Sequence, residues 1–225
     1  MKIRGDSAIR TPALLAVVAV ISYALLWVGY SHNWAWIVNC DTATLQATYD
    51  YGAHRAGWVE LWTAISTVSQ PVVVASVTAV AVVGATLRRR FRVAVFLAVV
   101  VAGSLAMTSI AKGLANRPRP ASALEVLHSS SFPSGHATTS AATLLAFVAV
   151  VAPVVGRPAR LMVGAAALAL VIVVGAARVI LNVHHLSDVL AGWALGYLWF
   201  LLCLIVVKPG YPARPSAVRV PESAG

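Results

Sequence analysis

Long runs of apolar residues dominate the chain, and short polar stretches separate them. Six runs come close to the roughly 20 residues that a helix needs to cross the hydrocarbon core of a bilayer. The pattern predicts an all-α integral membrane bundle of six transmembrane helices in one domain, residues 1–207, and Pro71 predicts a kink in the second helix. The predicted spans are residues 13–30, 64–87, 91–111, 136–155, 161–177 and 186–207.

The two ends of the chain differ in character. Lys2, Arg4 and Arg10 precede the first apolar run, which raises the alternative of a cleaved signal peptide. No small-x-small cleavage site follows Tyr30, so the pattern favours a retained membrane anchor. Residues 208–225 are rich in proline and are expected to form a disordered cytoplasmic tail.

Composition strengthens the membrane interpretation. Hydrophobic residues make up 60% of the chain and charged residues 11%, with a mean hydropathy of +0.83, whereas an ordinary soluble domain is roughly 45–50% apolar. These figures exclude an aqueous globular enzyme, a disordered protein, a coiled coil and a disulfide-stapled secreted domain. Cys40 lies in a polar stretch and Cys203 in an apolar run, so we expect neither a disulfide nor a metal site from them.

The excess of basic residues predicts the orientation. The chain carries 17 Lys and Arg against 7 Asp and Glu, a net charge of +10, which in a soluble protein would indicate nucleic acid. With the N-terminus inside, most basic residues fall on the inner face, which favours cytoplasmic termini in a cell (inner or plasma) membrane. The run from Arg88 to Arg90 is interpreted as a topology determinant that contacts anionic lipid. The five outer basic residues are Arg55, Lys112, Arg117, Arg119 and Arg178.

The longest outer segment, residues 31–63, contains six Trp and Tyr residues. Such amphipathic rings favour the headgroup layer, so we expect this segment to lie along the outer interface. Whether it also serves as a lid over a site is left open by the sequence.

Three short polar patterns fall on the predicted outer face. The first runs from Lys112 to Arg119-Pro120, the second is Phe132-Pro-Ser-Gly-His136, and the third runs from Arg178 through His184 to Asp188. Ionisable residues at membrane depth are costly, which makes them functional candidates. The three patterns therefore predict one extracytoplasmic site.

Each pattern has a chemical interpretation. The ammonium of Lys112 and the planar forks of Arg119 and Arg178 suit the oxygens of a phosphoryl group. Ser134 and Gly135 precede a predicted helix, where free backbone N–H groups and the helix dipole form an anion cradle.

The histidines add acid–base and nucleophilic chemistry. His184 and Asp188 are four residues apart, so the carboxylate can hold the imidazole in the tautomer with a nucleophilic second nitrogen. His136 remains as a second imidazole for proton transfer.

Together, Lys-x6-Arg-Pro, Pro-Ser-Gly-His and Arg-x5-His-x3-Asp resemble the three signature motifs of the type 2 phosphatidic acid phosphatase family, which shares its phosphate site with vanadium haloperoxidases. The resemblance implies that His184 attacks phosphorus and forms a phosphohistidine, that Asp188 orients it, and that His136 handles the proton of the leaving group. It also implies that no metal or other cofactor is needed. The implied phosphate-binding residues are Lys112, Arg119, Ser134, Gly135 and Arg178.

One residue departs from the family pattern, and several others are expected to have no role in catalysis. The family usually has Ser where this chain has Ala177, which removes one hydroxyl contact to phosphate. His185 is interpreted as structural and Arg117 as a lipid-headgroup contact. Solvated or headgroup-facing positions are expected for Glu125, His128, His32 and His54.

The resemblance implies a bacterial membrane hydrolase that removes the terminal phosphate of a lipid phosphate or diphosphate. Polyprenyl (undecaprenyl) diphosphate ranks first as substrate, with phosphatidylglycerol phosphate and phosphatidic acid as alternatives. A non-catalytic lipid transporter on the same scaffold is disfavoured by the complete catalytic set, and a vanadate-dependent peroxidase by the membrane character. The expected partners are the lipid phosphate and the bilayer, without nucleic acid; the sequence leaves the oligomeric state open.

Overall fold

The computed structural model describes residues 4–125, 127 and 129–210, with side chains from residue 12 onward. Within this part the chain is all-α and contains no strand, which confirms the predicted fold class. Of the predicted tail, only residues 208–210 fall within the described residues. The elements are α1 (Arg4–Ser31), α2 (Ala35–Gly52), α3 (Ala56–Val68), α4 (Pro71–Leu87), α5 (Phe91–Ala115), α6 (Gly135–Val151), the 3-10 turn η1 (Ala152–Val154), α7 (Arg157–Ile180) and α8 (Leu186–Val207).

The described part has five helices that are long and apolar enough to cross a membrane by themselves, namely α1, α5, α6 with η1, α7 and α8. A sixth crossing is formed if α3 and α4 count as one span, bent by 42° at the break between them. Pro71 occupies the first position of α4, where its missing N–H would have no partner in any case. The kink predicted at Pro71 is thus a break between two helices, and the helical segment begins at Ala56 instead of residue 64.

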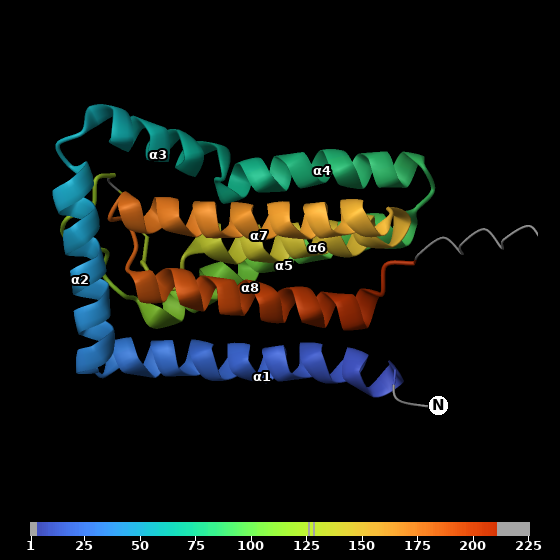
Figure 1. Cartoon of the computed structure of the whole chain (residues 1–225), viewed down its shortest axis with the longest axis horizontal. Helices are drawn as coiled ribbons and strands as arrows, with labels where there is room; N and C mark the ends of the chain where they lie inside the picture. Colours follow the sequence, from blue (N-terminus) through green and yellow to red (C-terminus); the bar gives the residue numbers. More distant parts are fainter. Residues whose placement is uncertain (1–3, 126, 128, 211–225) are drawn as a thin grey trace, which may run out of the picture.

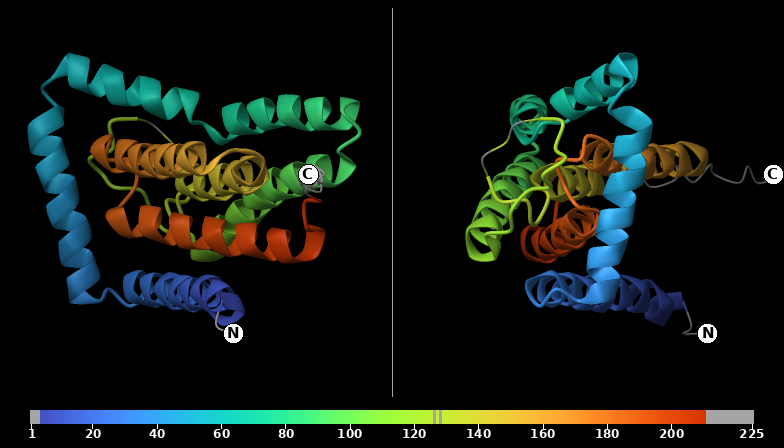
Figure 2. Two further views of the ribbon diagram at one scale, coloured as in Figure 1. Left: turned by 45° about the vertical axis from the view of Figure 1, so that its right-hand side comes forward. Right: turned by 90° about the vertical axis from the view of Figure 1, so that its left-hand side faces the viewer.

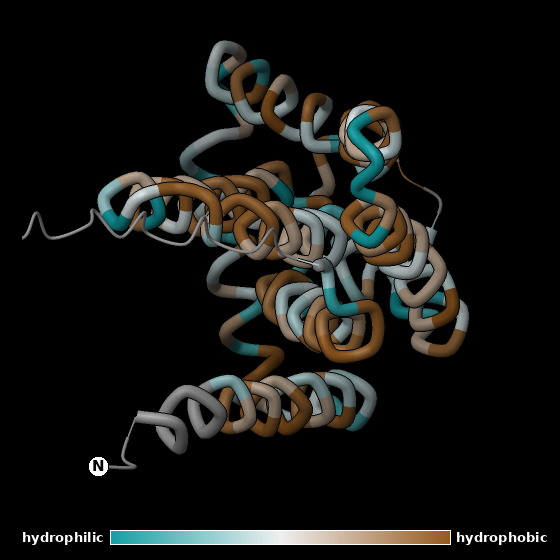
Figure 3. The backbone as a smooth tube through the Cα atoms, turned by 90° about the vertical axis from the view of Figure 1, so that its right-hand side faces the viewer, coloured by the Kyte–Doolittle hydropathy of each residue, from teal (hydrophilic) through white to brown (hydrophobic). Residues whose placement is uncertain are grey.

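The helices run side by side except for α2, which crosses one end of the bundle (Figures 1 and 2). The most extensive packing joins α6 to α8, with α5 and α7 against this pair and α1 on the outer side of α8. Figure 3 shows apolar residues on the outward faces of the helices as well as between them. Large exposed side chains such as Val80, Leu161 and Ile205 are suited to contact with lipid chains.

The close approach of α6 and α8 depends on two glycines. A Cβ on Gly196 would lie 2.4 Å from the carbonyl oxygen of Thr138, and one on Gly192 would lie 2.8 Å from that of Ser134. Small residues at this spacing let helix backbones pack tightly without a side chain between them. The contact fixes the start of α6 against the first turns of α8.

The two ends of the bundle carry different residues. The beginning of α1 and the end of α8 lie at the end of the bundle opposite α2 (Figure 1). The turn between α4 and α5, which contains the run Arg88 to Arg90, lies at the same end. The three polar patterns lie at the other end, beneath α2. Which end faces the cytoplasm stays a prediction.

Candidate active site

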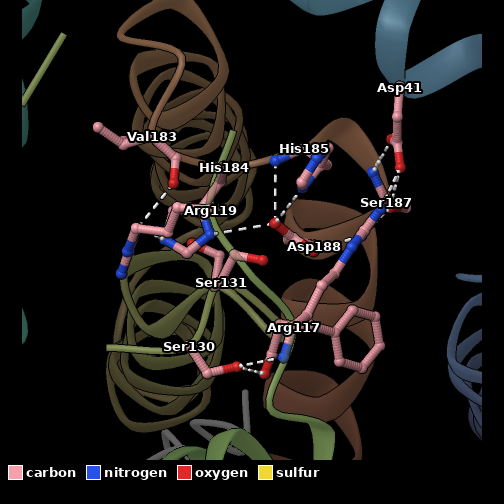
Figure 4. Close-up of polar contacts among 12 residues, drawn as sticks. Asp41, Arg117, Arg119, Ser130, Ser131, Val183, His184, His185, Ser187 and Asp188 are labelled. Atoms are coloured by element: carbon pink, nitrogen blue, oxygen red, sulfur yellow. Dashed lines mark hydrogen bonds and ion pairs between the residues drawn. The ribbon is translucent and has the colours of Figure 1, made fainter. Parts of the chain in front are cut away.

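Three chain segments meet at the α2 end of the bundle (Figure 4). They are the end of α5 with the loop that follows it, the start of α6, and the connection from α7 to α8. Because the polar patterns of the sequence sit at these helix ends, folding brings them to one place. The structure thus gathers the predicted site residues from three distant parts of the chain.

His184 and Asp188 form the centre of the site. His184 is 2% exposed and Asp188 is fully buried, and Nδ1 of the imidazole lies 3.4 Å from Oδ2 of the carboxylate. Burial lowers the pKa of His184 to about 3, although the Asp188 carboxylate acts in the opposite direction. The imidazole is therefore neutral at physiological pH, with Nδ1 directed at the carboxylate and Nε2 left as a nucleophile.

Arg119 lies on the Nε2 side of that imidazole. Its Nη1 is 3.3 Å from Nε2 of His184 and donates to the carbonyl of Val183 at 2.6 Å. Its Nε donates to the carbonyl of Ser129 at 2.9 Å. Burial lowers the pKa of Arg119, with Asp188 and Glu125 opposing that effect, but a guanidinium stays charged. A positive charge thus stands beside the nucleophilic nitrogen.

The other two cations are also held by the protein. Lys112 Nζ donates to the carbonyl of Ser130. Arg178 is 2% exposed; its Nη1 donates to Ser66 Oγ and lies 3.6 Å from Glu125 Oε2, while its Nε has no partner among the described residues. A buried guanidinium with an unused N–H can donate to a ligand oxygen.

The start of α6 completes the set. Ser134 precedes the helix with extended backbone, and its buried Oγ has no partner within the described part of the chain. Its N–H donates to the carbonyl of Asp188 at 3.0 Å. A Cβ on Gly135 would lie 4.0 Å from Lys112 Cε, so the first turn of α6 and the Lys112 side chain are neighbours. The N–H groups of a first turn lack helical partners and attract anions.

His136 lies in the same first turn of α6. Its Nε2 is 3.3 Å from the carbonyl oxygen of Ser66, the α3 residue that also binds Arg178. Sequence reasoning missed Ser66, because a serine inside an apolar run carries no motif. A hydroxyl at the start of a predicted span was the one signal available.

Two further charged residues join the site from unexpected positions. Arg117, expected to contact a lipid headgroup, donates instead to Asp188 Oδ1 at 2.6 Å and to Asp41 Oδ2 at 2.8 Å. Its side chain is only 10% exposed, so the headgroup expectation is wrong. Glu125 is expected from the sequence to face solvent or headgroups, but its carboxylate lies near the guanidinium of Arg178. Asp41 lacked any sequence signal, because it is one of three carboxylates in the aromatic outer segment and belongs to no motif.

The remaining residues singled out in the sequence lie around this centre. His185 caps α8: its N–H donates to Asp188 Oδ2 at 2.9 Å and its ring Nδ1 lies 3.3 Å from the same oxygen. Ala177 is fully buried next to Arg178. His32 and His54 are exposed, and His128 lies outside the described residues. Cys40 is exposed and Cys203 buried, and both are free thiols.

A pocket and an apolar groove lie near the site. A pocket of about 610 Å³ is lined by Trp27, Tyr30, Arg117, Arg119 and His185, between the end of α1 nearest α2 and the loop after α5. An apolar groove of about 510 Å³ runs between α1 and α8. Across the described residues, no group of three or more His, Cys, Asp or Glu side chains is placed to hold a metal ion.

A neutral buried imidazole between a carboxylate and a guanidinium, beside a cluster of cations and a helix start, is suited to phosphoryl transfer. The comparison with known families agrees with this chemistry. The sequence model of the PAP2 superfamily matches residues 93–210, just over half of the chain. The chain belongs to the PAP2 superfamily. All three polar patterns fall inside the matched range, and the protein is a phosphate-ester hydrolase.

The PAP2 fold is also found among solved structures. The bundle matches the crystal structure of a transmembrane PAP2-type phosphatidylglycerolphosphate phosphatase from Bacillus subtilis, with a TM-score of 0.70 and 24% sequence identity. The match covers 85% of this chain and 93% of that chain. A comparison with curated proteins gave no significant match.

Proposed function

We propose that this PAP2 protein hydrolyses the terminal phosphate of a lipid phosphate or lipid diphosphate at the extracytoplasmic face of the membrane, through a phosphohistidine. The observation that carries the proposal is the neutral imidazole of His184, with Nδ1 facing Asp188 and Nε2 beside Arg119. A nucleophile oriented by a carboxylate and next to a positive charge is the arrangement that covalent phosphoryl transfer requires.

In the first step, His184 Nε2 donates its electron pair to phosphorus and forms the N–P bond. The bond from phosphorus to the leaving oxygen breaks, and His136 supplies the proton to that oxygen. In the second step, His136 takes a proton from water, the water oxygen attacks phosphorus, and the N–P bond breaks. Inorganic phosphate leaves and both imidazoles return to their starting states.

Charge on the transferred phosphoryl group is balanced by the cations around it. Lys112, Arg119 and Arg178 supply positive charge, and Ser134 Oγ with the Gly135 N–H supplies uncharged donors. The three cations are held by backbone carbonyls and by Ser66, so little reorganisation is needed when charge develops. Each such donor contributes about 2.7–4 kcal/mol to a transition state in comparable sites.

The lipid character of the substrate is supported by the setting of the site. The apolar groove between α1 and α8 includes Leu190, two residues after Asp188, and Trp36 of α2. A lipid tail lying in this groove would keep its apolar surface out of water, while the phosphate of the same lipid reaches the helix ends.

Polyprenyl (undecaprenyl) diphosphate is the substrate that we rank first. A phosphatidylglycerol phosphate phosphatase is the second candidate, because the neighbour of similar fold carries that name. Phosphatidic acid is the third. The lining of the groove is mostly apolar, and apolar contacts discriminate weakly between lipid tails, so the ranking is decided by assay.

The test is phosphate release by purified protein in detergent, with undecaprenyl diphosphate, phosphatidylglycerol phosphate, phosphatidic acid and a soluble phosphate ester compared side by side. His184→Ala is expected to retain less than about 1% of the activity, because it removes the nucleophile. His54→Ala removes an exposed histidine from an outer turn and serves as the matched control. Retention of more than about 1% of the activity by His184→Ala would overturn the phosphohistidine, and absence of release from every lipid by the wild-type protein would overturn the proposed function.

A further inference from the structure

We propose that Asp41 of α2 and Arg117 of the loop after α5 are positioning residues, which hold the Asp188 carboxylate in the orientation that serves His184. The inference rests on the proposed function, since it assigns a role within that site. None of the contacts described above joins either residue to Lys112, Arg119 or Arg178, the proposed phosphate-binding cations. Their contacts lead instead to the first turn of α8.

The contacts form a continuous chain from α2 to Asp188 (Figure 4). The Asp41 carboxylate accepts from the Ser187 N–H at 2.9 Å, from Ser187 Oγ at 2.6 Å and from Arg117 Nη2 at 2.8 Å. Arg117 Nη1 then donates to Asp188 Oδ1 at 2.6 Å and to Ser187 Oγ at 2.7 Å. A planar guanidinium can serve two carboxylates at once because its N–H groups point in fixed directions.

This chain divides the two oxygens of Asp188 between different tasks. Arg117 binds Oδ1, whereas Oδ2 faces His184 Nδ1 and the His185 N–H. With Oδ1 fixed, rotation of the carboxylate is prevented and Oδ2 stays in reach of the imidazole. Without Arg117, Oδ1 would lose its short charged bond, and the carboxylate could turn away from His184.

Because Asp41, Arg117 and Asp188 are buried, their series of contacts is sensitive to the loss of any one of the three side chains. Asp41 is 3% exposed, Asp188 is fully buried and the Arg117 side chain is 10% exposed. Arg117 also packs over the ring of Tyr30 of α1, with its Cζ 4.8 Å from the ring centre. Removing one partner from such a group leaves a buried charge uncompensated, which has a large energetic cost. The crossing helix α2 thus contributes to the chemistry although its residues do not reach the reacting atoms.

The test compares Asp41→Asn and Arg117→Gln with Asp50→Asn in phosphate release from the lipid that the wild-type protein hydrolyses best. Asp50 lies on the same helix, and among the described residues its carboxylate contacts the exposed Gln46 alone, so Asp50→Asn is a matched control. At metal sites, residues that hydrogen-bond to the metal ligands typically contribute 10- to 100-fold to activity, and we take this factor as the scale for a partner of Asp188. We expect kcat of both site variants to fall by about that factor, while the inhibition constant of inorganic phosphate stays within about twofold of wild type because the phosphate-binding cations are intact.

Two further variants separate positioning from folding. Arg117→Lys keeps the charge but not the fork, and is expected to restore part of kcat relative to Arg117→Gln. Because the two residues act on Asp188 through the same series of contacts, the double variant Asp41→Asn with Arg117→Gln is expected to be no slower than the slower single variant. Thermal unfolding of each detergent-solubilised variant identifies any that fail to fold.

The proposal is overturned if folded Asp41→Asn matches Asp50→Asn in kcat, if the phosphate inhibition constant rises in step with the loss of kcat, or if the two substitutions multiply. A wild-type protein that releases no phosphate from any lipid overturns the proposed function, and the positioning role with it. The wild-type arm and the variant arms therefore report on the two proposals separately.

Discussion

Replacing Gly196 with alanine tests how closely the geometry of the site depends on the packing of α8 on α6. The new Cβ would lie 2.4 Å from the Thr138 carbonyl oxygen, 0.6 Å short of the 3.0 Å below which real Cβ contacts essentially never occur. The obstacle is helix backbone, which cannot swing aside as a flexible side chain would. The two helix axes must therefore separate by at least that shortfall, and overpacking of this kind costs about 1–3 kcal/mol.

The same displacement reaches the active site. Asp188 lies two turns before Gly196 on α8, and its carbonyl accepts from the Ser134 N–H at 3.0 Å. Separation of α8 from α6 moves the His184–Asp188 pair away from the anion-binding start of α6. A misplacement of about 1 Å can cost 10²-fold in rate, so we expect the Gly196→Ala variant to lose about tenfold in kcat.

The assay is thermal unfolding in detergent together with phosphate release, with Gly164→Ala as the control. Gly164 is also helical, on α7, but a Cβ there would meet nothing within 4 Å. That control is expected to be unchanged or more stable by up to about 1 kcal/mol, since alanine has the higher helix propensity. If Gly196→Ala equals Gly164→Ala in both stability and rate, the reasoning from the close approach of α6 and α8 is refuted.

Three further predictions concern the dyad and the sidedness of the site. Asp188→Asn is expected to lower kcat by about 10³-fold or more, because the amide favours the wrong imidazole tautomer, and a loss below tenfold would contradict that. Burial lowers the pKa of His184 to about 3 from about 6.5 in the unfolded chain, so the unfolded state binds the extra proton and stability falls as pH falls from about 6.5 towards 3. Between pH 7 and 5, wild type should lose about 2 kcal/mol more than His184→Asn in thermal unfolding; an equal loss would show that His184 is not buried neutral. A cysteine at Ala123, in a variant without Cys40 and Cys203, should react with an impermeant thiol reagent on intact cells, whereas reaction only after lysis would reverse the predicted orientation.

The spans could be predicted from the sequence because lipid imposes a minimum apolar length and excludes irregular backbone. The second span shows where that reasoning ends. The aromatic segment 31–63 is expected to lie along the interface, so the predicted helix begins at residue 64, but helical backbone extends from Ala56 through a bend before Pro71. A hydropathy pattern detects membrane depth but not the continuation of a helix into the headgroup layer.

The site residues with motif spacing could be predicted because each motif lies within one local segment. His184 and Asp188 are four residues apart across the start of α8, which begins at Leu186, and Ser134 and Gly135 lie where α6 begins, so local geometry determines much of their relation. Asp41 and Ser66 could not be found in this way. Asp41 is 76 residues from Arg117 along the chain, and only packing of α2 across the bundle brings the two together.

These contacts determine which positive charges at the α2 end of the bundle are free to bind a phosphate. Five basic residues were assigned to the outer face, and three of them, Lys112, Arg119 and Arg178, surround the proposed phosphate position. Arg117 is committed to two carboxylates, so its charge is already neutralised within the protein and is not free to bind phosphate. Because the buried carboxylates pair with Arg117, the cations that remain for a phosphorylated lipid are Lys112, Arg119 and Arg178. Substitution of Asp41 weakens the hold on Asp188 but leaves Lys112, Arg119 and Arg178 in place, which is why turnover is expected to fall while the inhibition constant of phosphate stays near that of wild type.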